Sequence, residues 1–434
     1  MFDELKRRDL LKKSGVLAMG MLAWPAWMPR VALRSNDAAP RGDVLVAIFM
    51  RGGADGLNIL VPHGDPDYYR ARSTIAIVQP RAAQPDSTID LDGMFGLHPA
   101  LRPFKELYDQ KVLASVHAVG SPDPTHSHFD AMDYLERGTP GEKAMATGWI
   151  GRHLQVKASD NKSPFRAVGL GAIVQQSLRG PIPAIALQSI ADFHLRGDNA
   201  EIARIQQTIA ALYEGGDFLQ VEGQQTLGAM QALAKVAQGK YTPANGARYP
   251  QGYFGQALQT LAQLLKGEIG VEVAAVDIGG WDTHQQEGGE TGQMARLLGD
   301  LADGLSAFYT DLQDRMKQIT VVTMSEFGRR VEENSSHGTD HGHGNVMFVL
   351  GGGVNGGKVY GDWPGLAQAK LYGPGDLAVT TDFRDVLGEI VYKRLGNSNL
   401  GAVFPNYTPK FRNLVQQQTA KSELPFSLGL RIPV

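Results

Sequence analysis

Short apolar runs, each followed by a polar or glycine-rich loop, recur along the chain. The run at 43–50 (DVLVAIFM) is almost continuously apolar, as expected of a strand buried on both faces. Similar runs predict strands at 112–119, 167–170, 184–187, 271–278, 319–323 and 346–350. Apolar residues spaced three and four apart predict helices at 100–108, 129–137, 291–315 and 382–394. Alternating strands and helices of this kind are typical of an α/β fold.

Four of the loops beside these strands are rich in Asp, His and Gly. They lie within 51–58, 121–130, 279–284 and 325–344. In open α/β sheets, ligands bind at the carboxyl ends of the strands, so we expect these loops to converge on one metal-dependent site. The candidate metal ligands are Asp55, His126, His128, Asp282, His284, Glu326, His341 and His343.

Simpler roles remain open for several of these positions. Asp55 also fits an Asp-Gly turn, and Asp282 fits a turn residue. Ser127 fits an N-cap of the helix that follows it. A hydroxyl at a helix N-terminus also lies in a positive field, which suits a nucleophile that attacks an anion. Arg51 and Arg329 are candidates for stabilising negative charge at such a site.

Composition narrows the chemistry. The chain has 434 residues, of which 43% are hydrophobic and 20% charged, and its net charge is −3. This is ordinary globular composition, and the near-neutral balance argues against nucleic acid as a partner. The chain contains no Cys, so disulfides and thiolate metal sites are excluded. Ligands from His, Asp, Glu and hydroxyl groups favour Zn, Mn, Mg, Ca or Fe.

The N-terminal segment 1–34 has the pattern of an export signal. Arg7 and Arg8 precede a short apolar run at 15–27, in the manner of a twin-arginine signal. That run is shorter than the roughly 20 residues that span a membrane, so no stable span is expected unless the signal stays uncleaved. We therefore expect a periplasmic or exported protein that uses the twin-arginine translocation machinery.

The chain resembles a known family in the segments FMRGGADGLN, HSHFDAMDY, GGWDTH, VTMSEFGRR and DHGHGNVMFVLGGGV. These resemble the bacterial family called domain of unknown function 1501, exported proteins placed in the alkaline phosphatase–sulfatase superfamily. The resemblance covers 43–410. It implies an alkaline-phosphatase-like three-layer α/β/α sandwich, with a mostly helical insertion within 155–270 and a C-terminal tail at 411–434.

The resemblance also implies chemistry: one or two divalent metal ions (Zn, Mn, Ca or Mg) and hydrolysis of phosphate or sulfate esters through a covalent intermediate. It implies Ser127 as the nucleophile. It implies metal ligands at Asp55, Asp282, His284, Glu326, and His341 or His343. Two departures stand out: Asp282 and His284 are two residues apart instead of four, and Phe327 stands where the superfamily has a ligand His.

The expected function is therefore an exported metal-dependent hydrolase acting on a small-molecule or polymer ester. The alternative is a non-hydrolytic metal-binding accessory protein of the cell envelope, which the missing imidazole at Phe327 favours. An oxidoreductase is suggested only by the export route. Neither a dinucleotide-binding GxGxxG motif after a strand nor a Cys ligand supports it.

Overall fold

The computed structural model describes residues 43–82, 84–190 and 240–418, and a few separate residues between 204 and 237. The expected signal segment 1–34 and the end of the tail, 419–434, lie outside the described residues. The same holds for most residues between 191 and 239, which belong to the segment where the helical insertion is expected.

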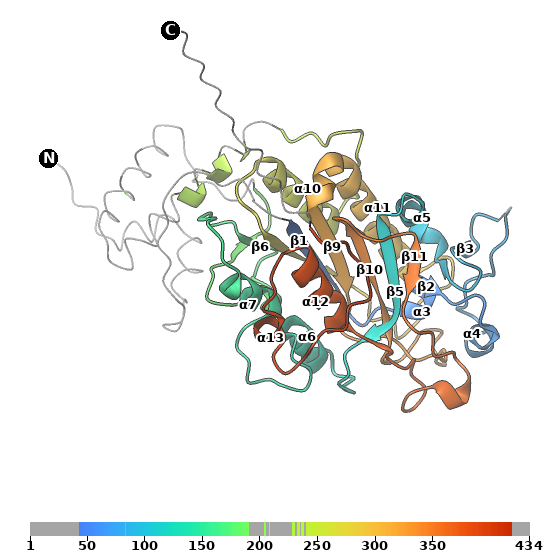
Figure 1. Ribbon diagram of the computed structural model, residues 1–434. Helices are drawn as coiled ribbons and strands as arrows, with labels where there is room; N and C mark the ends of the chain where they lie inside the picture. The colour runs from blue at the N-terminus through green and yellow to red at the C-terminus, as the bar shows by residue number, and fades with distance from the viewer. Residues whose placement is uncertain are drawn as a thin grey trace, which may run out of the picture.

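A central sheet runs through the molecule in the order β11-β5-β10-β9-β1-β8-β6-β7, and β12 pairs with β5 (Figure 1). Its strands are β1 (Val44–Arg51), β5 (Leu113–Gly120), β6 (Ala167–Leu170), β7 (Ile185–Leu187), β8 (Val273–Gly279), β9 (Ile319–Met324), β10 (Asn345–Gly351), β11 (Lys358–Tyr360) and β12 (Thr381–Asp382). A small separate sheet holds β2 (Leu60–Val61), β3 (Ile89–Asp90) and β4 (Gly96–Leu97).

All described pairings in the large sheet are parallel except those of β10, which runs antiparallel to β5 and β9. The carboxyl ends of β1, β5, β8 and β9 therefore lie at the same end of the sheet, where β10 begins. The register is consistent with this, because Arg51 pairs with Gly279 and Phe49 with Met324. The four loops rich in Asp, His and Gly are thus brought to one edge.

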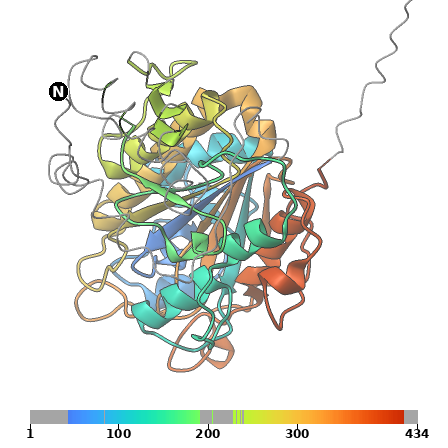
Figure 2. The same ribbon diagram turned by 90° about the vertical axis from the view of Figure 1, so that its left-hand side faces the viewer.

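Helices cover both faces of this sheet (Figures 1 and 2). One face packs on α5 (Arg102–Asp109), α10 (Tyr253–Lys266) and α11 (Gln293–Leu312). The other packs on α6 (His128–Arg137), α7 (Trp149–Val156), α12 (Phe383–Lys393) and α13 (Leu400–Val403). Side chains of β1 alternate between the two cores, as strand geometry requires: Val46 and Ile48 face one, Leu45 and Ala47 the other.

The predicted three-layer α/β/α class is confirmed, and the predicted strands and long helices agree with the structure to within about three residues at their ends. The remaining short elements are α3 (Gly56–Ile59), α4 (Pro66–Ala71), η1 (Pro99–Leu101), η2 (Gln176–Leu178), η3 (Gln313–Gln318) and η4 (Gln368–Lys370). Of the tail, Leu414 and Val415 are fully buried in the core beneath α12.

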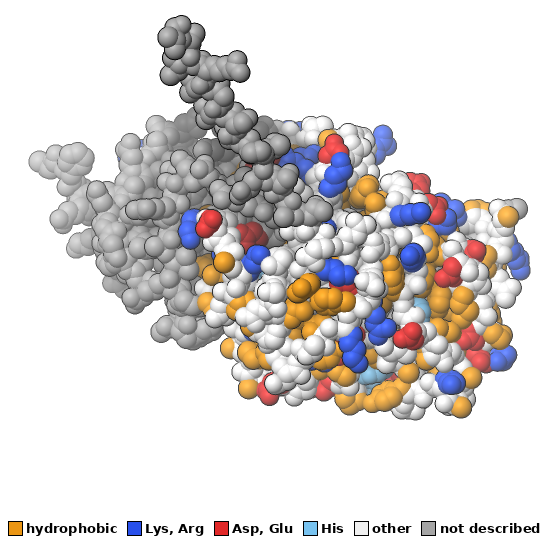
Figure 3. Space-filling view, in the orientation of Figure 1, with side chains coloured by type: hydrophobic (Ala, Val, Ile, Leu, Met, Phe, Trp, Pro, Cys, Tyr) orange, Lys and Arg blue, Asp and Glu red, His pale blue; other side chains and the backbone are white. Residues whose placement is uncertain are grey.

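On the face shown in Figure 3, Lys and Arg side chains are spread among Asp and Glu side chains and hydrophobic ones. Among the described residues, no helix is both long enough and apolar enough to cross a membrane.

Candidate metal centre

Three side chains from three different loops meet at the sheet edge. His128 begins α6 after β5, Asp282 follows β8, and His341 precedes β10. One ligand atom from each lies within 4.8 Å of the others. Asp282 Oδ1 is 3.4 Å from Nε2 of His128 and 3.3 Å from Nε2 of His341. Two imidazoles and one carboxylate are an ordinary ligand set for a divalent transition metal.

The hydrogen bonds of the two histidines decide which ring nitrogen faces the cluster. His128 Nδ1 lies 2.8 Å from Oε1 of Glu326, and His341 Nδ1 lies 2.8 Å from the carbonyl oxygen of His126. Because a carboxylate and a carbonyl only accept hydrogen bonds, both Nδ1 atoms donate. In a neutral ring, Nε2 then carries the lone pair. Nε2 of His128 is buried without a hydrogen-bond partner, as expected of an atom set to bind a metal ion.

The local charges favour the metal-binding protonation states. Burial alone would raise the pKa of Asp282, but hydrogen bonding and charge from Arg329 lower it to about 2. Burial, and then the charge of Arg329, lowers the pKa of His341. The hydrogen bond to Glu326 raises the pKa of His128. At neutral pH, Asp282 is therefore an anion and His341 a neutral ligand, while a cation must compete with a proton on His128.

A third imidazole lies beside the cluster. Nε2 of His284 is 2.9 Å from Nε2 of His341 and 3.1 Å from Oδ1 of Asp282. Its Nδ1 is 3.4 Å from Asp340. His284 is thus placed as a fourth ligand or as a proton-transferring group next to the site.

Glu326 lies behind His128. Its Oε1 accepts hydrogen bonds from His128 and, at 2.8 Å, from the backbone N–H of Gly52, and its Oε2 accepts from the Ser325 hydroxyl at 3.1 Å. Burial would raise the pKa of Glu326, but the hydrogen bond from His128, and then those from backbone N–H groups, lower it. The predicted ligand is therefore a positioning residue that orients His128. Phe327, at the place of the missing imidazole, packs its ring 4.9 Å from His128 and 4.7 Å from His341.

The side chain of Arg329 connects its own loop to the loop that carries Asp282. It is buried and donates hydrogen bonds to the carbonyls of Trp281 and Thr339 and, at 2.7 Å, to Oδ1 of Asp282. Gly52 approaches the same loop so closely that a Cβ atom would lie 2.6 Å from the backbone nitrogen of Asp282. The predicted role of Arg329 in stabilising a substrate anion is thus replaced by a role in holding Asp282.

Asp55 does not join the cluster. Its carboxylate is fully buried, caps α3 and forms an ion pair with the equally buried Arg72. Glu287 is an electrostatic neighbour of this pair. It accepts hydrogen bonds from the hydroxyls of Thr283 at 2.9 Å and Thr339 at 2.8 Å. Burial, and then the neighbouring Asp55, raises the pKa of Glu287 well above its usual value. The structure corrects the prediction that Asp55 is a ligand and assigns it to a network that joins two of the site loops.

Two predicted histidine ligands also point elsewhere. His126 Nε2 lies 3.0 Å from Oδ2 of the buried Asp376. His343 stacks on Tyr372 with ring centroids 4.8 Å apart, and burial lowers its pKa to about 4. Each lies two residues from a histidine that does join the cluster, so spacing alone did not separate them.

The two remaining predicted site residues have structural partners. Arg51 lies between Glu136, at 3.2 Å, and Asp277, at 2.9 Å, so its charge is already neutralised. Ser127 is exposed, and its hydroxyl accepts from the backbone N–H of Asp130 at 3.5 Å, as an N-cap does.

Sequence reasoning missed Arg72, Glu287 and Asp376. Each lies outside the recognisable motifs, and its partner is distant in the chain. Asp340 lies within a quoted motif, so its position beside His341 was the available signal.

The sequence matches the model of the family described as "Protein of unknown function (DUF1501)" over residues 111–391. A search of curated proteins finds no match. Solved structures of similar arrangement include the PsFucS1 sulfatase from Pseudoalteromonas sp., with 10% identity, a TM-score of 0.38, and coverage of 87% of this chain and 74% of that one.

Two other solved structures are similar to the same low degree. The C-terminal periplasmic domain of EcEptC from Escherichia coli, in complex with Zn, has 11% identity and a TM-score of 0.38, covering 88% of this chain and 92% of that one. Alkaline phosphatase from the Antarctic bacterium TAB5 has 10% identity and a TM-score of 0.27, with coverage of 73% and 92%. Likenesses this distant carry no argument about activity. The match over residues 111–391 does show the family, and the chain belongs to the DUF1501 family.

Proposed function

We propose that this protein is a metal-dependent hydrolase of phosphate or sulfate esters. The observation that carries the proposal is the convergence of His128, Asp282 and His341, whose ligand atoms lie within 4.8 Å of one another. Three protein ligands leave coordination positions open for water and substrate, as catalytic metal sites require. A bound divalent cation would supply Lewis acidity and a lowered pKa for bound water.

The residues around the cluster have roles that fit this chemistry. Glu326 and the His126 carbonyl fix the rings of His128 and His341, and Arg329 holds Asp282. The imidazole of His284 is partly exposed, so it can exchange a proton with a reacting group. Ser127, exposed one residue before His128, is the candidate nucleophile.

The geometry supports one metal ion better than two. Asp55 and His126, two of the residues that a second ion would need, are engaged by Arg72 and Asp376. The donor set of two or three imidazoles and one carboxylate suits Zn, Mn or Fe better than Mg or Ca, which prefer oxygen ligands.

One observation favours the alternative, a metal-binding protein without hydrolytic activity. Arg51 and Arg329 are both occupied by protein groups. Within the described residues, the Ser127 hydroxyl contacts the N–H of Asp130 but no general base.

Metal analysis of the purified protein tests the site. We expect about one divalent metal ion per chain, lost in His128→Ala, Asp282→Ala and His341→Ala. His126→Ala and His343→Ala are matched controls, because these histidines share the same loops but point away, and they should keep the metal. Metal content that is equal in all five variants would overturn the assignment.

An ester screen then separates the two functions. Protein that is stripped by a chelator and reloaded should hydrolyse phosphate or sulfate monoesters only in the reloaded form. Full metal content without turnover of any phosphate or sulfate monoester or diester would leave the binding role.

Export by the twin-arginine pathway is part of the same proposal and rests on Arg7, Arg8 and the apolar run after them. Replacing both arginines with Lys should retain the protein in the cytoplasmic fraction of the cell. Unchanged export of that variant would contradict this step.

A further inference from the structure

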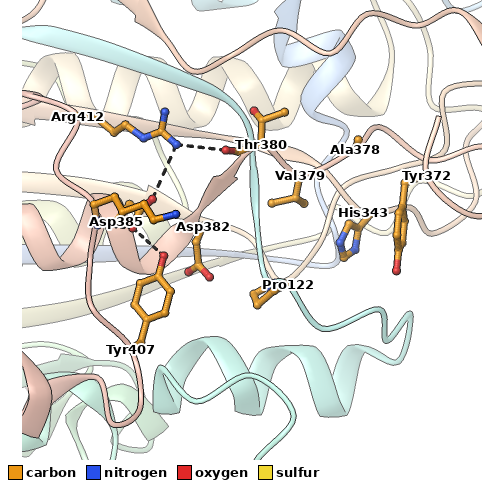
Figure 4. A pocket seen from close by; sticks show the side chains of 11 residues that line it. Pro122, His343, Tyr372, Ala378, Val379, Thr380, Asp382, Asp385, Tyr407 and Arg412 are labelled. Atoms are coloured by element: carbon orange, nitrogen blue, oxygen red, sulfur yellow. Dashed lines mark hydrogen bonds and ion pairs between the residues drawn. The ribbon is translucent and has the colours of Figure 1, made fainter. Parts of the chain in front are cut away.

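A second feature of the molecule is a cavity of about 380 Å³. Figure 4 shows that its walls come from segments far apart in the chain. They include Pro122, His343, Tyr372, Asp382, Tyr407 and Lys410. The volume is in the range of pockets that hold small organic ligands.

The cavity and the metal centre share two loops. The loop after β5 contributes Pro122 to the cavity and leads to His128 at the metal centre. The segment before β10 contributes His343 to the cavity and His341 to the metal centre. The two loops are joined by the hydrogen bond from His341 Nδ1 to the carbonyl of His126. A ligand that fills the cavity would therefore contact the same two loops that carry His128 and His341.

A histidine of low exposure lines this cavity. His343 is only 6% exposed, and its ring forms no hydrogen bond with any described residue. It lies in the cavity wall (Figure 4). Because no described protein group uses its ring nitrogens, the imidazole can form a hydrogen bond with a ligand in the cavity.

Charges of both signs line the same space. Asp382 accepts hydrogen bonds from Arg384 at 2.9 and 2.7 Å, and Asp385 accepts from the Tyr407 hydroxyl at 2.7 Å. The ammonium group of Lys410, which is exposed at the rim, has no ion-pair partner among the described residues.

This mixture selects for a neutral ligand. A strongly charged ligand of either sign would meet a like charge in the cavity. Because the two carboxylates are already partly compensated, they suit hydroxyl donors better than an ammonium ion. Hydroxyl groups both donate and accept hydrogen bonds, so they can satisfy the carboxylates, the imidazole and the ammonium together.

Aromatic rings give the cavity a flat apolar surface. Tyr372 is 43% exposed and stacks on His343, with the two rings inclined by 22°. Tyr407 lies on the opposite side, where the guanidinium group of Arg384 packs 3.6 Å from its ring centroid. Flat aromatic surfaces pack well against the C–H face of a six-membered ring that carries hydroxyl groups at its edge.

We propose that this cavity binds a saccharide unit. The identity of the substrate rests on the proposed function. It is then a phosphate or sulfate ester of a sugar, with the sugar ring in the cavity and the ester group at His128, Asp282 and His341.

Steady-state kinetics with two kinds of ester, with and without a sugar ring, test the proposal. Glucose 6-phosphate and glucose 6-sulfate are compared with β-glycerophosphate and glycerol sulfate, which lack the ring. In Tyr372→Ala, KM for the sugar esters should rise about fivefold to tenfold, with little change in kcat and none for the glycerol esters. Tyr392→Ala removes an equally exposed tyrosine outside the cavity and should behave as the unaltered protein. Equal effects of Tyr372→Ala on both ester types would overturn the proposal.

A binding measurement separates this inference from the proposed function. Saturation-transfer NMR is run on the whole protein with methyl glycosides of glucose, galactose, mannose and N-acetylglucosamine. Saturation transfer to the ring protons, weakened in Tyr372→Ala but not in Tyr392→Ala, supports the sugar site even if no ester is hydrolysed. Absence of transfer to all four glycosides, or equal transfer in Tyr372→Ala, overturns the sugar site even if the protein hydrolyses glycerol esters.

Discussion

Nδ1 of His128 lies 2.8 Å from Oε1 of Glu326, so a buried carboxylate orients the imidazole that faces Asp282. We expect Glu326→Gln to keep the shape of this contact but to weaken metal affinity about 10- to 100-fold, as loss of such a partner does elsewhere. Competition against a fluorescent chelator measures the affinity. Glu332→Gln, at an exposed position in the same loop, is the control. Unchanged affinity in Glu326→Gln would show that the orientation does not depend on this carboxylate.

Ser127 combines an N-cap position with a candidate nucleophile, and two substitutions separate these roles. Ser127→Ala should cost about 1 kcal/mol of stability through loss of the cap. Ser127→Asp keeps a capping oxygen, so the free energy of unfolding should stay near that of the unaltered protein. If the hydroxyl is the nucleophile, both variants lose ester hydrolysis while retaining metal. Activity that survives in Ser127→Asp would instead indicate direct attack by water.

The ion pair of Asp55 and Arg72 is completely buried, and we expect it to contribute to stability, not to metal binding. Asp55→Ala leaves the guanidinium group buried and unpaired, at a cost of about 3–5 kcal/mol. Denaturant unfolding measures the change. Asp67→Ala, which breaks the exposed pair with Arg70, should cost less than about 1 kcal/mol. Metal content per folded molecule should remain unchanged in Asp55→Ala, and its loss would restore Asp55 as a ligand.

Glu287 is expected to make stability fall as pH rises. Its pKa is raised by burial and by Asp55, so the folded state holds this proton more tightly than the unfolded chain does. The resulting stabilisation is fully present below the ordinary pKa of 4.5 and is lost as pH rises through the raised value. The pKa of Asp55 is lowered from 3.8, so its own opposite contribution changes at lower pH.

Glu287→Gln imitates the protonated acid and should remove this dependence. Relative to the unaltered protein, its stability should improve with pH by up to about 1.4 kcal/mol per pH unit. Urea unfolding from about pH 5 to 8 measures the two slopes. Glu287→Ala, in contrast, leaves the hydroxyls of Thr283 and Thr339 without their acceptor and should be destabilised by about 2–4 kcal/mol. Parallel stability curves for Glu287→Gln and the unaltered protein would contradict a raised pKa of Glu287 in the folded protein.

The sequence by itself determined the layers of the fold. Apolar runs such as 43–50 and 319–323 are buried on both faces. Burial on both faces requires a continuous run of hydrophobic residues, which is visible in the sequence. The sequence also predicted that the four loops rich in Asp, His and Gly would converge, because the carboxyl ends of neighbouring parallel strands meet at one end of the sheet. His128, Asp282 and His341 were all among the predicted ligands for that reason.

Only the tertiary structure decided which polar side chains face the centre. His126 and His128 are indistinguishable by residue type and spacing, yet one is held by Asp376 and the other by Glu326, which lie 250 and 198 residues further along the chain. Asp55 follows a strand, as a ligand would, but its carboxylate forms an ion pair with Arg72. Side-chain direction depends on hydrogen-bond partners that are distant in sequence, and those partners leave no local pattern. The motifs therefore predicted which loops converge, and the packing of the four loops decided which of their side chains meet.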